Sequence, residues 1–466
     1  MGGGRVTNPI DLPDDLRAVV MRASMPDYTE WQRQMRAIGG CSNPIRLIGR
    51  RVVSDAATGK VIDVFDTSAL MPGYLLKGCG NRRASRCPAC SKVYQSDTYQ
   101  LVRAGLAGGK DVPASVSEHP LVFVTLTAPS FGPVHARHRQ TGRDGLPRRC
   151  RVRRESEPCP HGLSTSCLRR HQEDDEAVGQ PLCPECYDYV GAVLWNAHAG
   201  QLWHAFAVYL DRHVAAAVGI SRKALRQEAK RSYVKVAEYQ ARGLVHFHAV
   251  VRIDGPDGPT SPPPLWATTG LLEDAVLSAA KTVSVTAPGP DGDRTMRFGA
   301  QIDVQHIVLD DAVQSQGLSQ RHVAGYVAKY ATKAAEVAGA VDRRVRRLSN
   351  LDNADVTPHA RRMIATCLEL AELPEYRDTT LVNWAHMLGY RGHCTTKSAA
   401  YSTTLSKLRG DRAEHQAAKH REALGLPAID PTKVVIDAEW RFVMAGLQRG
   451  EAAIVAALRP RQHAAT

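Results

Sequence analysis

The sequence predicts an α+β fold in which helices flank a central antiparallel sheet. Three observations lead to this prediction. A β-branched run covers residues 121–127, two further β-rich runs at 233–240 and 244–253 are separated by only three residues, and an alanine-rich helical pattern covers 321–338. Between the first run and the later ones lies a cysteine-rich insertion, and the residues after the helix read as mostly helical.

Length and composition suggest the division into domains. At roughly 150 residues per domain, a chain of 466 residues suggests about three of them. We expect an N-terminal region over 1–75, a sheet domain over 76–340 with the insertion at about 132–186, and a mostly helical C-terminal region over 350–466. With 43% hydrophobic and 23% charged residues, the chain is not a disordered one.

Charge and hydropathy narrow the class of partner and the compartment. The formal net charge of +13 favours an anionic partner such as nucleic acid, although solubility alone would also account for it. No run of about 18 uncharged apolar residues occurs, which argues against a membrane span. The N-terminus lacks the apolar core of a secretory signal, so we expect a cytoplasmic protein whose cysteines stay reduced.

The elements follow in chain order. A helical pattern covers 16–38, and a strand is expected at 61–65. The run 121–127 ends in Ala-Pro-Ser-Phe-Gly-Pro, as a buried strand before a turn would. Large apolar residues recur at helical spacing over 187–218, which predicts one or two packed helices. The tripeptide between the two later strands has the length and the glycine of a hairpin loop.

The second strand of this hairpin carries the sequence His-Phe-His. In a strand, His246 and His248 share one face and Phe247 points to the other. Two histidines so spaced also arise by chance, so their context matters. If Gln240 pairs with Leu244, then Glu238 lies directly across from His246 on the same face.

One carboxylate and two imidazoles would then converge on a metal ion. Such a mixed set of nitrogen and oxygen ligands suits Mg²⁺ or Mn²⁺ held for phosphate chemistry, although zinc also binds imidazoles readily. Gln240 lies on the same face and can replace or supplement Glu238 as the third ligand.

The predicted helix carries a pair of tyrosines. Tyr326 and Tyr330 are i, i+4 neighbours on a polar stripe that also includes Lys329. Val323 and Val327 lie on an apolar stripe, so the phenols are expected to face away from the core. A phenol is a poor nucleophile at its ordinary pKa near 10, but nearby lysines favour the phenolate. The simpler alternative is two amphipathic tyrosines on a helix surface.

Two C-x-x-C motifs, 87–90 and 183–186, have the spacing of zinc knuckles. Eight cysteines between residues 79 and 186 are enough for two four-ligand zinc sites, with His161 as a substitute ligand: Cys79, Cys87, Cys90, Cys150, Cys159, Cys167, Cys183 and Cys186. Their pairing is not readable from the sequence. A redox role is the rival interpretation, but no thioredoxin-like βαβ pattern surrounds either motif.

Other residues are assigned by the same reasoning. Cys41, Cys367 and Cys394 are expected to be ordinary thiols. The basic stretch 135–154 is expected to contact DNA phosphates or to form a solvated loop. Charges and hydroxyls suited to phosphate contacts follow at Arg391, His393, Lys397, Ser398, Tyr401, Ser402 and Thr403.

Three motifs taken in order resemble a known family. A hydrophobic-Thr-Leu-Thr strand (124–127), His-hydrophobic-His (246–248) and Tyr-x-x-Lys-Tyr (326–330) resemble the motifs of rolling-circle replication initiators of the HUH superfamily. Conjugative relaxases of that superfamily usually carry the tyrosine before the histidines. The segments 238–248 and 389–398, with the cysteine pattern, are similar to the initiators of actinomycete integrative plasmids.

This resemblance implies an HUH-endonuclease-like fold and a nick at a plasmid origin, single-stranded at the nick. A tyrosine would attack the scissile phosphate, remain joined to the 5′ phosphate and free a 3′ hydroxyl for polymerase, with Mg²⁺ or Mn²⁺ bound by the histidines and Glu238. A second tyrosine would close the circle, as in the A proteins of microvirid phages. In some plasmid relatives only the second tyrosine nicks, so Tyr330 ranks at least equal to Tyr326. Lys329, between them, would neutralise charge.

Two other functions remain open. A zinc-dependent DNA-binding protein without catalysis would explain the charge and the cysteines. A relaxase or transposase-like nuclease would share the chemistry on another substrate. The chain has no G-x-x-x-x-G-K-[ST] phosphate-binding loop, so unwinding at an origin would require a host helicase.

Overall fold

In the computed structural model, residues 13–138, 140–142, 144–153, 157–308, 318–333 and 335–458 are described. The chain divides into two compact units, residues 1–97 with 405–466, and residues 98–404. Helix α3 (Pro88–Ala107) runs from one unit into the other. No helix within these described ranges is long and apolar enough to cross a membrane.

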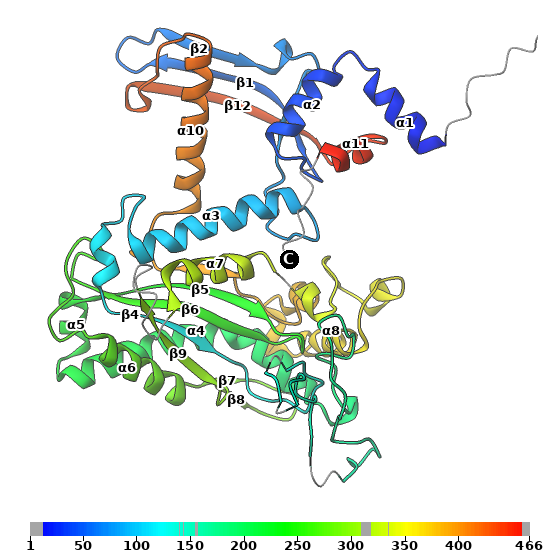
Figure 1. Cartoon of the computed structure of the whole chain (residues 1–466), viewed down its shortest axis with the longest axis vertical. Helices are drawn as coiled ribbons and strands as arrows, with labels where there is room; N and C mark the ends of the chain where they lie inside the picture. Colours follow the sequence, from blue (N-terminus) through cyan, green and yellow to red (C-terminus); the bar gives the residue numbers. More distant parts are fainter. Residues whose placement is uncertain are drawn as a thin grey trace, which may run out of the picture. The chain divides into compact units, whose positions relative to one another are not determined.

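The first unit is built on a sheet whose strands come from both ends of the chain (Figure 1). The strand order is β12-β1-β2, and β3 also pairs with β1, with every pairing antiparallel. Its elements are α1 (Asp14–Ala23), α2 (Tyr28–Ala37), β1 (Ile45–Asp55), β2 (Val61–Asp66), β3 (Leu75–Lys77), α10 (Leu405–Ala423), β12 (Val434–Ala445) and α11 (Glu451–Leu458).

A small core and a buried ion cluster close this unit. Trp31 and Met35 of α2 pack with Val455 of α11, and all three are fully buried. The carboxylate of Glu451 is also fully buried, where it accepts hydrogen bonds from Arg46 Nη2 at 2.8 Å and from Arg22 Nε at 3.2 Å. The beginning and the end of the described chain are thereby joined through one buried carboxylate.

This arrangement differs from the domain plan predicted from the sequence. Residues 1–75 do not form a region by themselves, because β1 pairs along its whole length with β12, from Asp55 opposite Val434 to Ile45 opposite Ala445. The expectation of a mostly helical C-terminal region is wrong at β12. Residues 358–397, which were assigned to that region, belong to the second unit. Pairing between strands so far apart in the sequence leaves no local pattern by which it can be predicted.

The second unit is built on a six-stranded sheet in the order β10-β9-β4-β6-β5-β11. All pairings are antiparallel except that of β10 with β9. The strands are β4 (Leu121–Leu126), β5 (Lys230–Tyr239), β6 (Val245–Asp254), β9 (Ile302–Val308), β10 (Leu318–Ser319) and β11 (Thr395–Lys397), and a separate pair is formed by β7 (Val285–Ala287) and β8 (Arg294–Met296). The α+β prediction is confirmed, and so are the strand at 121–127 and the hairpin.

Helices cover the two faces of this sheet (Figure 1). On one side lie α4 (Tyr189–Val218) and α6 (Thr269–Thr282), and α7 (Gln320–Ala331) lies on the other. The remaining helices are α5 (Arg222–Glu228), α8 (Pro358–Ala371) and α9 (Pro374–Arg377), with short 3-10 turns at 114–118, 335–338 and 348–351 and a longer one at 381–387.

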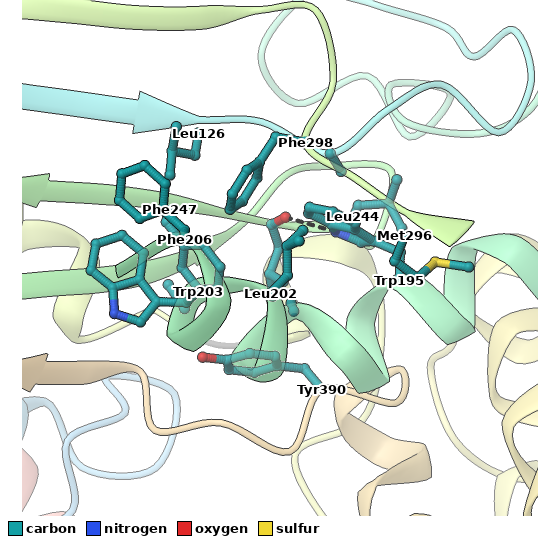
Figure 2. Packing of buried hydrophobic residues seen from close by; sticks show 14 of the residues in the cluster. Leu126, Trp195, Leu202, Trp203, Phe206, Leu244, Phe247, Met296, Phe298 and Tyr390 are labelled. Atoms are coloured by element: carbon teal, nitrogen blue, oxygen red, sulfur yellow. Dashed lines mark hydrogen bonds between the residues drawn. The ribbon is translucent and has the colours of Figure 1, made fainter. Parts of the chain in front are cut away.

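The main hydrophobic core lies between the sheet and α4. Helix α4 is a single helix of 30 residues, capped by Asp188, whose side chain accepts from the N–H of Gly191, and ended by Gly219 with a positive φ of 76°. Phe247 points from β6 into this core and packs edge-on against Trp203, with ring centroids 5.7 Å apart (Figure 2). The indole N–H of Trp195 donates to the carbonyl of Val245 at 3.1 Å and fixes the helix to the hairpin.

Candidate active site

The hairpin has the register predicted from the sequence. The N–H of Gln240 donates to the carbonyl of Leu244 at 2.9 Å, and Glu238 lies opposite His246. Since Phe247 fills the core beneath the sheet, strand alternation sends both histidines to the opposite face, the one covered by α7. Arg242 in the turn donates to the carbonyls of Ala128 and Pro129, both at 2.9 Å, and so ties the hairpin loop to the residues that follow β4.

Glu238, His246 and His248 converge on one point. Oε2 of Glu238 lies 2.9 Å from Nε2 of His246 and 3.0 Å from Nε2 of His248, and the two Nε2 atoms are 3.2 Å apart. An octahedral ion with bonds of about 2.1 Å has neighbouring ligands about 3.0 Å apart, so this donor set fits one divalent cation. Gln240, the alternative ligand, instead accepts a hydrogen bond from Nε of Arg242 at 2.9 Å.

The electrostatics of Glu238 and His248 favour metal binding. Burial opposes ionisation of Glu238, but the hydrogen bonds to His246 and His248 outweigh it and hold the pKa of Glu238 below its ordinary value. Burial lowers the pKa of His248, only partly offset by its contact with Glu238. An ionised carboxylate and a neutral imidazole are the protonation states that ligate a cation.

Thr125 orients His248 and was not predicted as a site residue. It lies across from His248 in the register of β4 and β6, and its hydroxyl oxygen is 3.0 Å from Nδ1 of that histidine. A tautomer that carries its proton on Nδ1 donates to Thr125 and leaves Nε2 free toward Glu238. Phe123, two residues earlier, stacks on the His248 ring with a centroid distance of 5.8 Å. The Thr-Leu-Thr motif was the signal that could have identified Thr125.

Helix α7 brings both predicted tyrosines to this group. The hydroxyl of Tyr326 lies 3.2 Å from Nε2 of His248. The rings of Tyr326 and Tyr330 are 4.5 Å apart at their centroids, and Tyr330 lies 5.9 Å from the imidazole of His248. The helix starts at Ser319, whose side chain accepts from the N–H of His322 at 3.2 Å.

The prediction that the phenols face away from the core is wrong. Tyr330 is only 8% exposed, and Tyr326 is half-buried against the sheet. The buried surface of α7 includes its alanines as well as its valines, since Ala324 and Ala328 are almost fully buried. The two tyrosines of the polar stripe therefore face a polar patch of the sheet, which an amphipathic pattern does not distinguish from solvent.

Two lysines flank Tyr330. The ammonium of Lys333 lies 4.6 Å from the centre of the Tyr330 ring, and that of Lys329 lies 5.8 Å from it. Lys329 is exposed, as expected of a residue that would meet phosphate. The sequence prediction named Lys329 as the charge-neutralising residue, and the structure places Lys333 closer to the ring.

The predicted zinc ligands fall into three groups rather than two. Each group has four members: Cys41, Cys79, Cys87 and Cys90; His135, Cys150, Cys167 and His171; Cys159, His161, Cys183 and Cys186. The assignment of Cys41 as an ordinary thiol does not hold, since its sulfur lies within 3.7 Å of the sulfurs of both Cys87 and Cys90. His161 joins a group as the sequence had allowed. His135 and His171 were missed, because neither belongs to a C-x-x-C motif.

The predicted DNA contacts have mixed outcomes. Tyr401 is fully buried and donates to the carbonyl of Val102 at 3.1 Å, so it cannot reach DNA. Ser398 accepts from the N–H of Tyr233 at 2.9 Å and belongs to the edge of the sheet. In the basic stretch 135–154, Arg148 and Arg149 are exposed, and residues 139, 143 and 154 lie outside the described residues. DNA contact there stays a prediction.

Comparisons with known proteins identify the family. A family model described as "Replication initiator protein, pSAM2" matches residues 27–460. A "Replication initiator protein" of Streptomyces ambofaciens is 45% identical over 457 residues, which cover 97% of this chain and 93% of the relative. No solved structure matches. The chain therefore belongs to the family of plasmid replication initiators described by that model.

Proposed function

We propose that this initiator starts plasmid replication by nicking one strand of the origin through an attack by tyrosine on the DNA phosphate. The observation that carries the proposal is the hydroxyl of Tyr326 at 3.2 Å from His248, within the group that also contains Glu238. A candidate nucleophile thereby lies beside a candidate cation-binding set, and this arrangement supports phosphoryl transfer. A purely structural role for these side chains would not require a phenol, two imidazoles and a carboxylate to lie together.

The reaction exchanges one phosphodiester bond for another. The phenolate oxygen of a tyrosine attacks the scissile phosphorus, the bond from phosphorus to the 3′ oxygen breaks, and that oxygen takes up a proton. The 5′ phosphate stays on the tyrosine, and the free 3′ hydroxyl serves as the primer for a host polymerase. A host helicase would unwind the duplex.

Each side chain has a role in this scheme. Glu238, His246 and His248 would hold Mg²⁺ or Mn²⁺, which polarises the phosphate when it is bound. Thr125 keeps Nε2 of His248 directed at that site. Lys329 and Lys333 neutralise the charge of the phosphate and favour the phenolate of Tyr330. The second tyrosine attacks when the replication fork returns and transfers the strand to close the circle.

A covalent-adduct assay tests the proposal. The purified chain is incubated with labelled single-stranded origin DNA and Mn²⁺, Mg²⁺ or EDTA, and the products are separated under denaturing conditions. We expect a metal-dependent adduct that the Tyr326→Phe, Tyr330→Phe double variant does not form. The single variants assign the first attack and the strand transfer.

Matched controls separate chemistry from folding. Tyr209→Phe removes a phenol from α4, on the other side of the sheet, and should leave the adduct unchanged. If the wild-type chain binds origin DNA but forms no adduct with either metal, the alternative of a DNA-binding protein without catalysis is correct. An adduct that forms in EDTA would exclude the role proposed for Glu238 and the histidines.

A further inference from the structure

Nine of the eleven cysteines and three histidines share one geometry at three places. In each of the three groups of four defined above, all the ligand atoms lie within 4.8 Å of one another. All eleven cysteines are free thiols. Cys367 and Cys394 lie outside these groups and are buried. A disulfide would need sulfur atoms about 2.05 Å apart, whereas the sulfur of Cys41 lies 3.6 Å from that of Cys90 and 3.7 Å from that of Cys87.

The separations match a tetrahedral zinc ion. With bonds of about 2.3 Å to sulfur and 2.05 Å to nitrogen, tetrahedral zinc holds two sulfurs about 3.8 Å apart and a sulfur and a nitrogen about 3.5 Å apart. The sulfur of Cys41 is 3.6 Å from that of Cys90. Nδ1 of His161 is 3.3 Å from the sulfur of Cys186 and 3.6 Å from that of Cys183.

The second group carries an orienting carboxylate of the kind that metal-bound histidines have. Nε2 of His171 lies 3.5 Å from the sulfur of Cys167, and its Nδ1 lies 2.7 Å from Oδ2 of Asp175. The carboxylate fixes the proton on Nδ1 and leaves Nε2 free as a ligand. The sulfur of Cys150 in turn accepts the N–H of Ala136 at 3.2 Å.

The described part of the insertion buries few large apolar side chains. Among its described residues, four large apolar side chains have exposed fractions of 44–60%: Leu146, Val152, Leu163 and Leu168. Val134, Val178 and Leu182 are only partly buried, and Val134 packs against the main core rather than within the insertion. Its buried side chains include the ligands Cys150, Cys167, His171 and Cys183. Because the described part of the insertion buries so little apolar area, bound metal would account for its order.

The third group also lies at the start of the helix that supports the active-site hairpin. Cys183 and Cys186 immediately precede α4, on which Asn196 donates to the carbonyl of Gly243 at 2.8 Å and accepts from the N–H of Val245 at 3.1 Å. Metal bound there would fix the end of the insertion next to the helix that holds the hairpin in register.

We propose that the chain binds three structural zinc ions, in a Cys₄ site of the first unit and in Cys₂His₂ and Cys₃His sites of the insertion. These sites are separate from the cation site of the proposed function and do not depend on it. The ligand sets account for nine thiolates and three imidazoles, and leave Cys367 and Cys394 outside the three sites.

Native mass spectrometry of the full chain tests the number of bound zinc ions, and X-ray absorption tests the identity of their ligands. The measurements use the wild type and a Glu238→Ala, His246→Ala, His248→Ala variant, so that zinc at the cation site is not counted. We expect three zinc ions per chain in that variant, with an average of three sulfurs and one nitrogen around each. Two zinc ions, or an average of four sulfurs, would overturn the assignment.

Single substitutions then test each site. In the same background, Cys41→Ser, His171→Ala and Cys186→Ser should each lower the zinc content by one, whereas Cys367→Ser and the exposed His204→Ala should leave it unchanged. If a ligand variant does not fold, titration of the parent chain with a mercurial gives the same answer, since three zinc ions should be released as nine thiols react. The proposal is contradicted if Cys41→Ser retains all three zinc ions, or if zinc release during the titration is not proportional to the number of thiols that have reacted.

Discussion

Nε2 of His248 lies 3.2 Å from the phenol oxygen of Tyr326, although 78 residues separate the two in the chain. Two packing arrangements produce this contact. Phe247 is buried in the core on one face of the sheet, so His246 and His248, its neighbours in β6, point to the other face. Helix α7 lies over that other face, and its tyrosines point toward the sheet. The proposed chemistry thus depends on residues that never touch DNA.

Thr125→Val should weaken metal binding at this site. The substitution keeps the shape of the side chain but removes the hydroxyl that holds Nδ1 of His248 at 3.0 Å, so the imidazole loses its fixed tautomer. We expect the Mn²⁺ concentration that gives half-maximal nicking to rise about 10- to 100-fold. A metal titration of nicking rates measures this effect.

Thr125→Ser retains a hydroxyl and should restore most of the wild-type metal response. If Thr125→Val and Thr125→Ser give the same metal titration as the wild type, Thr125 has only a packing role in β4.

Phe247→Ala should destabilise the second unit by about 3 to 5 kcal/mol, because it removes a fully buried ring that packs against Trp203. Urea unfolding followed by tryptophan fluorescence measures the change. Phe442→Ala is the matched control, since Phe442 is 61% exposed and should change stability by less than about 0.5 kcal/mol. Equal effects of the two substitutions would contradict the packing argument.

The hairpin could be predicted from the sequence because its information is local. Alternation fixes which face His246 and His248 share, and a three-residue loop with Gly243 fixes the register that sets Glu238 opposite His246. Both inferences need only a dozen consecutive residues. They also identify the candidate cation-binding group before any tertiary contact is known.

The remaining features depend on contacts between distant segments. No local pattern pairs Ile45 with Ala445 or brings Cys41 beside Cys90. His171 resembles any other histidine until Asp175 and Cys167 are seen on either side of its ring. The predicted orientation of Tyr330 was wrong because an amphipathic pattern shows which face of a helix is polar. It does not show whether that face contacts solvent or another part of the protein.

Lys235→Met should stabilise the protein near neutral pH. Lys235 is 4% exposed, with its ammonium 4.3 Å from the centre of the Phe247 ring, and burial lowers its pKa from 10.5 to about 8. The folded state therefore bears the cost of the buried charge in full below pH 8. Between pH 8 and about 10.5 the unfolded chain binds more protons, so the stability of the wild type rises with pH.

We expect Lys235→Met to gain about 3 kcal/mol at pH 7 and to lose this advantage as the pH approaches 10.5. Urea unfolding of both proteins at several pH values measures the difference, and exposed Lys223→Met serves as the control. A difference that does not change between pH 7 and 10.5 would show that folding does not lower the pKa of Lys235.

Glu451→Gln should destabilise the first unit by about 3 to 5 kcal/mol, because it leaves the buried guanidinium of Arg46 without its counter-charge and leaves Arg22 with Asp27 alone. The amide keeps the volume of the side chain, so the loss reports charge and not packing. Thermal unfolding monitored by hydrogen exchange in β1 and β12 localises the effect, since these strands join the two ends of the chain. The exposed Glu439→Gln on β12 should have no measurable effect. A stability loss shared equally by the two variants would mean that the buried ion cluster is not what holds the first unit together.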